Sequence, residues 1–295
     1  MPELPEVETV ARLLAPRAIG RTILGVEVHW ERTLGGSSAR DFKRAVIGAK
    51  IVALHRRAKY LIFDLRRDER PAGHLVGHLR MSGRMHIERA GFEPGIHARL
   101  ALALDDGTIF HFIDVRKFGR ISFEADLQRV FRRLGDEPLE KSFTAERLHA
   151  LLLSRKRRLK PLLLDQSVVA GLGNIYVDES LHRARLHPLS NSGSVDLSAA
   201  RRLHAAVQKI LRAAIDGEGS SFDTFYRTPE GKPGRFQARF RVYGREGKPC
   251  GRCKSPIVKF TVGQRGTHVC PTCQPYRATL KPRRRSARAK ARRAR

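Results

Sequence analysis

Hydrophobic positions follow two different spacings along the chain, and the change comes near Leu134. Residues 4–14 (LPEVETVARLL) place Val7, Val10, Leu13 and Leu14 at helical spacing, with acidic side chains near the start, where they favour the helix dipole. Short apolar or alternating runs follow at residues 23–29, 50–54, 60–65, 74–79, 99–104 and 108–113. Strands spaced this closely without intervening helices predict an antiparallel two-layer β-sandwich with flanking helices over residues 1–131.

Beyond Leu134 the apolar spacing becomes helical. Helical periodicity covers residues 145–153, 160–165, 174–184 and 197–215. Residues 217–234 follow, rich in Gly, Ser, Thr and Pro, and loops of this length are often functional. We therefore expect an α+β chain, in which a helical domain at 132–240 follows the sandwich. A cysteine-containing module at 241–275 and a basic disordered tail at 276–295 complete the predicted organisation.

The charge of the chain indicates a polyanionic partner. There are 58 Lys and Arg against 29 Asp and Glu, which gives a net charge of +29. The last 15 residues (KPRRRSARAKARRAR) carry nine of the basic side chains and no acidic one, so the body is basic too. No apolar run approaches the ~20 residues of a membrane span, and the N-terminus lacks a signal-peptide pattern. These features predict an intracellular protein without a membrane partner.

The four cysteines form two pairs, Cys250-x2-Cys253 and Cys270-x2-Cys273, separated by 16 residues. This spacing is typical of a zinc ion held by four thiolates. Four protein ligands leave no open coordination position, so one structural Zn²⁺ is expected. The alternative is four reduced cysteines in a core. The basic residues between the pairs could equally be a phosphate-binding hairpin or a solvated hairpin tip.

Several segments, taken together, resemble a known family. They are MPELPEVETV at the N-terminus, RRAKYL at 56–61, HLRMSG at 78–83, DVRKFG at 114–119, VVAGLGNIYVDESL at 168–181 and the cysteine pairs. Their order over nearly the whole chain resembles bacterial formamidopyrimidine-DNA glycosylase. The resemblance implies a bifunctional DNA repair glycosylase and AP lyase. Such an enzyme excises oxidised purines (8-oxoguanine, formamidopyrimidines) from duplex DNA and nicks the strand by β,δ-elimination.

The same resemblance implies a helix-two-turn-helix in the helical domain and a lesion-covering role for the loop at 217–234. It also implies that Met1 is removed, which leaves Pro2 as an N-terminal secondary amine that forms the Schiff base. An α-amino group has a pKa of ~8, so part of it is neutral at physiological pH. Glu3 corresponds to the general acid/base that protonates the deoxyribose ring oxygen, and Glu6 to a carboxylate that positions the site. An isolated pair of such acids would only stabilise a helix N-terminus.

Further positions match the family's DNA contacts. Met81, Arg116 and Phe118 correspond to the residues that fill the void left by the everted nucleotide, with Arg116 facing the orphaned cytosine. Outside these motifs, the two apolar residues would be assigned to the core and the arginine to a solvated surface. Three neighbours depart from the family pattern, namely Arg80 for Gly, Val115 for Pro and Lys117 for Arg.

The resemblance assigns five more residues to the backbone contacts or the catalytic set. Lys59 and His78 correspond to phosphate contacts of the sandwich, Asn174 to one of the helix-two-turn-helix, and Arg265 to one of the zinc-finger hairpin. Lys160 resembles a lysine close to the damaged base, although it could equally be one more charge in a basic run. The helix that starts at Asn174 is expected to present its N-terminal amides to a phosphate.

Two other functions remain possible on the sequence. An endonuclease VIII-like enzyme would remove oxidised pyrimidines, but that branch usually has Gly where this chain has Leu4. A basic zinc-finger DNA-binding protein without activity would explain the charge and the cysteines, but not the intact MPELPE segment. The expected partner is damaged double-stranded DNA, and the expected state is a monomer in the bacterial cytoplasm at the nucleoid.

Overall fold

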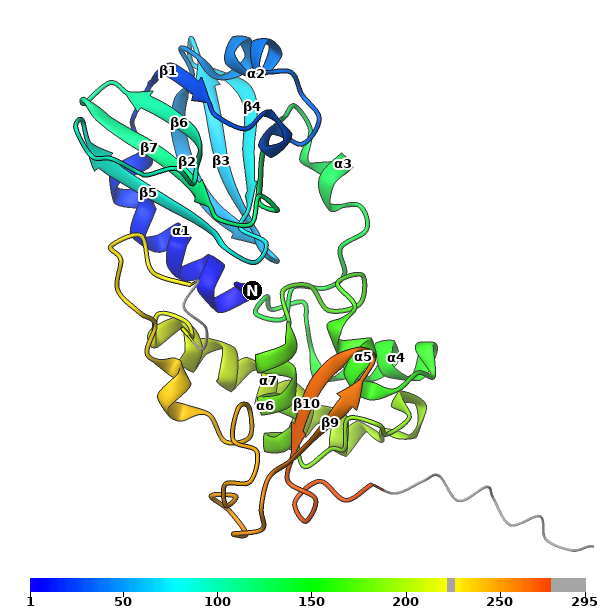
Figure 1. The fold of residues 1–295 in the computed structure, drawn as a ribbon. Coiled ribbons are helices and arrows are strands. Elements are labelled where there is room, and N and C mark those ends of the chain that lie inside the picture. Colours follow the sequence, from blue (N-terminus) through cyan, green and yellow to red (C-terminus); the bar gives the residue numbers. More distant parts are fainter. Residues whose placement is uncertain (222–225, 277–295) are drawn as a thin grey trace, which may run out of the picture.

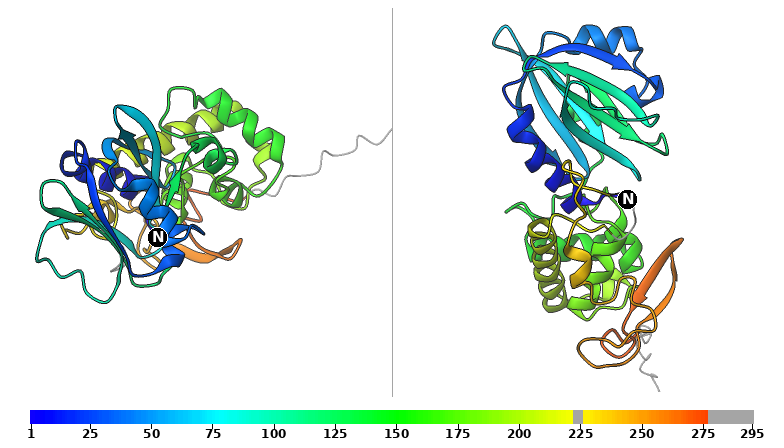
Figure 2. Two further views of the ribbon diagram at one scale, coloured as in Figure 1. Left: turned by 90° about the horizontal axis from the view of Figure 1, so that it is seen from above. Right: turned by 60° about the vertical axis from the view of Figure 1, so that its left-hand side comes forward.

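The computed structural model describes residues 1–221 and 226–276, which form two lobes with the N-terminus between them (Figure 1). A β-sandwich forms one lobe, and helices with a small hairpin form the other, as the rotated views also show (Figure 2). The centre of the expected lesion loop (222–225) and the expected tail beyond Tyr276 lie outside the described residues. Within the described residues, no helix has the length and apolar character needed to cross a bilayer.

The sandwich consists of two antiparallel four-stranded sheets, ordered β1-β6-β7-β5 and β2-β3-β4-β8. The strands are β1 (Ile23–Val28), β2 (Lys50–Arg57), β3 (Tyr60–Arg67), β4 (Arg70–His78), β5 (Gly83–Arg89), β6 (Ala98–Leu104), β7 (Thr108–Asp114) and β8 (Arg120–Glu124). Phe63 and Phe110 from opposite sheets meet edge to face across the core, with ring centroids 5.7 Å apart. The predicted sandwich is thus confirmed, with two strands, β5 and β8, added to the six expected.

Helix α1 (Leu4–Ala18) connects the two lobes. Val7, Val10 and Leu14 pack into the sandwich core, as their spacing predicts, whereas Leu4 packs into the core of the helical lobe. The Leu4 amide also donates to the carbonyl of Gly171 at 3.1 Å. Because α1 begins inside this contact, the residues just before it are held between the lobes.

The second lobe is built around α6 (Asn174–Ala184) and the longer α7 (Leu197–Asp216), which pack against each other. The smaller helices are α2 (Ala39–Val46) on the sandwich, then α3 (Leu127–Phe131), α4 (Ala145–Arg155) and α5 (Leu159–Leu164), with short 3-10 turns η1 (Glu31–Leu34), η2 (Ser192–Ser194) and η3 (Phe236–Arg239). Thr144 and Asp196 cap α4 and α7 with side-chain oxygens. The four helices predicted for this lobe are found within two residues of their expected ends. The hairpin β9 (Val258–Val262) and β10 (Arg265–Val269) packs against α6.

Candidate active site and zinc centre

A cavity of about 310 Å³ lies where the two lobes meet. Its wall contains seven of the residues predicted from the sequence, namely Pro2, Glu3, Glu6, Lys59, Met81, Asn174 and Arg265. They come from the N-terminus and the first turn of α1, the β2–β3 turn, the loop after β4, the start of α6 and the start of β10. Distant parts of the chain therefore meet in one cavity, next to Pro2.

Glu3 is buried against the first turn of α6. Its Oε1 accepts the Ile175 amide at 3.0 Å, and its Oε2 accepts the Tyr176 amide at 3.5 Å. Burial raises the pKa of Glu3 to about 7, against the opposing charge of Lys59 and with a further rise from Glu6. The first turn of α6 was expected to face a DNA phosphate, and in the structure two of its amides bind a carboxylate of this chain. Glu3 can hold and release a proton near neutral pH.

Glu6 joins three segments around the cavity. Its carboxylate accepts the backbone amide of Glu3 at 2.8 Å, the amide of Ser220 at 2.7 Å and the hydroxyl of Tyr176. Burial raises its pKa, with the Tyr176 hydroxyl and the backbone amides opposing the rise. Gly219 lies so close that a Cβ there would be 2.9 Å from Glu6. Glu6 therefore fixes the N-terminus relative to α6 and to the start of the loop at 217–234.

Lys59 and Arg265 supply positive charge from opposite lobes. Lys59 is 5% exposed, and its ammonium makes no hydrogen bond to the described residues. Burial lowers its pKa, while Glu3 and Glu6 raise it. Arg265 is exposed at the first position of β10, directly after Gln264, whose φ of 62° turns the hairpin. Two cations beside buried carboxylates suit a cavity that receives a phosphate-flanked ligand.

Lys160 was expected close to the damaged base, but it does not line the cavity. It is fully buried, and its Nζ donates to Asp178 at 2.7 Å, to the Gly266 carbonyl at 3.0 Å and to the Thr267 hydroxyl at 2.9 Å. Burial lowers its pKa, and Asp178 raises it. Since Gly266 and Thr267 belong to β10, the buried lysine ties this strand to α5 and α6, rather than standing as one more solvated charge.

Asn174 reinforces the same junction. Its Nδ2 donates to the Gly266 carbonyl at 3.0 Å, and its Oδ1 is buried without a hydrogen-bond partner among the described residues. The side chain thus lies in the cavity wall and contacts the hairpin that carries Arg265.

The predicted wedge residues lie on two loops that buried polar groups join. Met81 is 38% exposed and Phe118 49%, and the Arg116 guanidinium stacks 4.9 Å from the Phe118 ring centroid. Asp114, which is fully buried, accepts the Ser82 hydroxyl at 2.5 Å. The Asp114 carboxylate also accepts the Gly119 amide at 2.6 Å, and the Arg116 amide lies 3.2 Å from both Asp114 and Ser82. The two loops therefore present their exposed side chains as one unit.

His78 lies beside the cavity rather than in its wall. Burial and the charges of Arg80 and Lys59 lower its pKa to about 3, so the ring is neutral at physiological pH. Its Nδ1 accepts the Arg80 amide at 3.0 Å. This bond places the ring proton on Nε2, and His78 is therefore a neutral hydrogen-bond donor.

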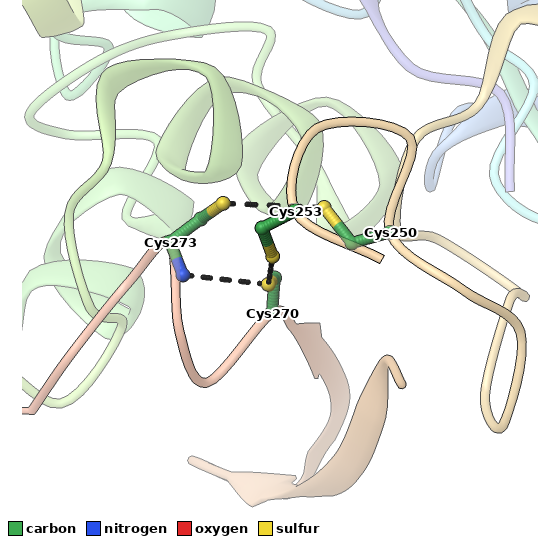
Figure 3. Close-up of side chains that lie close together, drawn as sticks. All are labelled: Cys250, Cys253, Cys270 and Cys273. Atoms are coloured by element: carbon green, nitrogen blue, oxygen red, sulfur yellow. Dashed lines mark hydrogen bonds between the residues drawn. The ribbon is translucent and has the colours of Figure 1, made fainter. Parts of the chain in front are cut away.

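The four cysteines gather at the base of the β9–β10 hairpin (Figure 3). Their sulfurs lie within 4.8 Å of one another, with Cys250 and Cys273 at 4.0 Å and Cys253 and Cys270 at 3.3 Å. Four thiolates around a tetrahedral Zn²⁺, with Zn–S of about 2.3 Å, would be about 3.8 Å apart. All four are free, and the amides of Arg252 and Cys273 point at cysteine sulfurs from 3.4 Å. The cluster fits one structural zinc ion.

Some residues of this site were not predicted from the sequence. Tyr176 and Ser220 hold Glu6, Asp114 joins the wedge loops, and Asp178 pairs with Lys160. Tyr176, Asp114 and Asp178 lie inside the quoted family motifs, and that was the only signal for them. Gly173 is different, because a glycine in this motif was expected to keep the turn free of a Cβ atom; here a Cβ would lie 2.2 Å from the Glu3 carboxyl carbon.

Comparisons with known proteins agree with this geometry. Family models for the formamidopyrimidine-DNA glycosylase N-terminal domain, its H2TH domain and a zinc finger found in FPG and IleRS match residues 1–121, 134–225 and 247–275. The formamidopyrimidine-DNA glycosylase of Heliobacterium modesticaldum is 44% identical, over 93% of this chain and 100% of its own length. That of Roseiflexus is 43% identical over the same shares.

Solved structures show the same relationship. A Lactococcus lactis Fpg variant in complex with DNA that contains Fapy-dG has a TM-score of 0.85 and 36% identity, over 93% of this chain and all of the other. The MutM (FPG) protein of Thermus thermophilus has a TM-score of 0.82 and 40% identity, over 92% of this chain and 98% of the other. With the motif residues assembled in one cavity, these likenesses show that the chain belongs to the formamidopyrimidine-DNA glycosylase family.

Proposed function

We propose that this chain excises oxidised purines, 8-oxoguanine and formamidopyrimidines, from duplex DNA and cuts the strand at the resulting abasic site, with Pro2 as the nucleophile. Removal of Met1 would free the Pro2 nitrogen. At a pKa of ~8, about one amine in ten is then neutral at pH 7, against far fewer for a lysine at ~10.4. The observation that carries the proposal is Glu3, with a pKa of about 7, next to Pro2 in the cavity wall.

The electron flow follows from a secondary amine at this position. The Pro2 nitrogen bonds to C1′ and then gives up its proton, which restores its lone pair, and the bond from C1′ to the base breaks, with its electron pair leaving on the base. The nitrogen lone pair then expels the ring oxygen O4′, which takes a proton and leaves an iminium. The iminium acidifies the C2′ hydrogens, so loss of one of them expels the 3′ phosphate. A second elimination expels the 5′ phosphate, which leaves a one-nucleotide gap.

Glu3 is the proton donor to O4′ in this scheme. Its raised pKa keeps a large fraction protonated at pH 7, and the two amides of α6 stabilise the carboxylate that forms when the proton leaves. Glu6 positions the Glu3 backbone from within hydrogen-bond distance. Both the protonated and the ionised form of Glu3 are therefore stabilised, beside the position that the ring oxygen would take.

The remaining predicted residues would hold the DNA. Lys59 and Arg265 would contact phosphates beside the lesion, because both line the cavity from opposite lobes. His78 would donate from Nε2, and Asn174 would contribute from the start of α6. The wedge side chains would fill the void in the duplex, Met81 from one loop and Arg116 with Phe118 from the other. Their link through Asp114 supports insertion as one unit.

Lys160 and the zinc centre act on the site through β10. Zinc bound to the four thiolates would fix the base of the hairpin, and Lys160 would fix its middle at Gly266 and Thr267. We therefore assign Lys160 a positioning role for Arg265, in place of a catalytic one. We also propose the division at 1–131, 132–240, 241–275 and 276–295. A monomer is sufficient, because one chain supplies the whole cavity, and the substrate indicates action at the nucleoid in the cytoplasm.

A strand-incision panel tests the proposed function. Duplexes with 8-oxoguanine opposite C, thymine glycol opposite A, or an abasic site are incubated with the protein lacking Met1. Incision of the first and third, with little of the second, is the expected result. Preference for thymine glycol would favour the endonuclease VIII-like alternative. Binding without any incision would favour the DNA-binding module.

The matched variants are Pro2→Gly and Glu3→Gln. A glycine keeps an N-terminal amine but makes it primary and removes the ring, whereas the glutamine cannot donate the proton. Both are expected to lose base excision on 8-oxoguanine while retaining DNA binding. Full excision by Glu3→Gln would show that Glu3 is not the proton donor.

A further inference from the structure

Arg80 occupies a backbone conformation that an arginine rarely adopts. It follows β4 in the turn to β5 and has a φ of 52°, in the left-handed region, where side chains with a Cβ are strained. The turn demands this conformation, because the Gly83 amide closes it by donating to the Leu79 carbonyl at 2.9 Å. A glycine would relieve the strain at Arg80, so this site favours a residue other than arginine on stability alone.

The side chain of Arg80 is exposed and has no carboxylate within ion-pair distance in the described part of the chain. It directly precedes Met81, which lines the cavity. Its charge also lies close enough to His78 to lower the pKa of that ring, together with Lys59. Lys59, His78 and Arg80 therefore lie on one edge of the sandwich, at the ends of β2, β3 and β4, beside the cavity.

We propose that Arg80 is an additional phosphate contact for the damaged strand, beside the contacts predicted for Lys59 and His78. Its guanidinium would pair with a phosphate next to the point where Met81 enters the duplex, and so hold the strand against the wedge. We favour a phosphate over a base as the ligand because Arg80 lies beside Lys59 and His78, for which phosphate contacts are also predicted. The inference rests on the proposed function only in placing DNA at this cavity.

The test compares Arg80→Gly with Arg185→Gly. Arg185 is also exposed and left-handed, with a φ of 59°, but it ends α6. Eleven residues of helix separate it from the Asn174 end that lines the cavity, about 16 Å at 1.5 Å per residue. Each glycine removes one positive charge and one strained φ. We expect the two variants to show similar small rises in Tm, because both relieve the same kind of strain.

Affinity for a duplex with a non-cleavable abasic analogue is measured against salt concentration. Loss of one phosphate contact lowers the slope of log K against log salt by about 0.9 and is expected to weaken binding about fivefold at low salt. This change is predicted for Arg80→Gly, while Arg185→Gly keeps the wild-type slope and Arg80→Lys retains most of it. Equal slopes for wild type and Arg80→Gly would overturn the proposal.

A loss that depends on the base opposite the lesion would also overturn it, because a phosphate contact carries no sequence information. These binding measurements are independent of catalysis. If the wild-type protein bound the analogue but incised no lesion, the proposed function would fail, while the salt slopes would still decide the role of Arg80.

Discussion

Replacing Gly173 by alanine is expected to inactivate the enzyme through Glu3. The backbone at Gly173 has a φ of −138°, which alanine adopts without strain, so only crowding matters. A Cβ would lie 2.2 Å from the carboxyl carbon of Glu3 and 2.5 Å from its Oε1, whereas ordinary contact begins at 3.4 Å. Glu3 must therefore move by about 1 Å and weaken its 3.0 Å bond to the Ile175 amide. A displacement of this size costs about 100-fold in rate.

The assay is single-turnover excision of 8-oxoguanine from a duplex, with Gly25→Ala as the control. Gly25 lies in β1, where a new Cβ meets only Ala103 at an ordinary 3.6 Å. If crowding acts through Glu3, Gly173→Ala combined with Glu3→Gln will be no slower than Glu3→Gln alone, so the two losses will not add. Full additivity, or normal excision by Gly173→Ala, would refute this reasoning.

Three further predictions concern protons, the buried lysine and the metal. Glu3 has a folded pKa of about 7, above the ordinary glutamate value of 4.5, so its contribution to stability falls as pH rises from about 4.5 to about 7. Excision should slow above pH 7, because Glu3 then loses the proton that it donates. Urea titrations should show that Glu3→Gln removes this fall in stability, and an unchanged fall would contradict the assignment. Lys160→Met removes the cation that neutralises the buried Asp178 carboxylate, which keeps, among the described residues, only its contacts with His268, and should cost about 3 kcal/mol in the free energy of unfolding and weaken DNA binding. Both losses should be partly recovered in the double variant with Asp178→Asn. Normal stability and DNA binding with excision lost would instead indicate a direct catalytic role. Chelation of zinc should lower the affinity for duplex DNA to that of the Arg265→Ala variant, because the metal holds the hairpin that carries Arg265. Anisotropy titrations should show no further loss when Arg265→Ala is itself chelated. An additional loss would mean that the metal does not act through the hairpin.

Features with a local signature could be predicted from the sequence. The cysteine spacing indicated the four-thiolate cluster, and the alternating runs indicated six of the eight sandwich strands. Among the missed elements, helix α2 buries only Phe42 and Val46 and β8 has only five residues, so each offers a short pattern. Strand β5 alternates buried and less buried positions through Met85 and Ile87, so the sequence did carry a signal for it.

Contacts between distant residues could not be predicted from spacing. Glu3 and Gly173 are 170 residues apart, and only the folded structure, in which the residue before α1 lies against the residue before α6, shows that no side chain fits between them. Lys160 follows a basic run, yet its ammonium is buried because Asp178 and two oxygen atoms of β10 neutralise and bind it. Similarly, Asp114 is the last residue of β7, and nothing in its position along the chain shows that its carboxylate joins the two wedge loops. Burial and pairing decide these roles, and the sequence shows neither.

The identity of the nucleophile is the central claim, and covalent trapping tests it most directly. The protein lacking Met1 is mixed with duplex DNA that contains an abasic site, and borohydride reduces the imine that forms to a stable amine. Peptide mapping by mass spectrometry then locates the adduct. The account predicts the adduct on Pro2, in a cavity wall shared with Glu3 and Lys59. An adduct on Lys59, or on any other lysine, in place of Pro2 would contradict it.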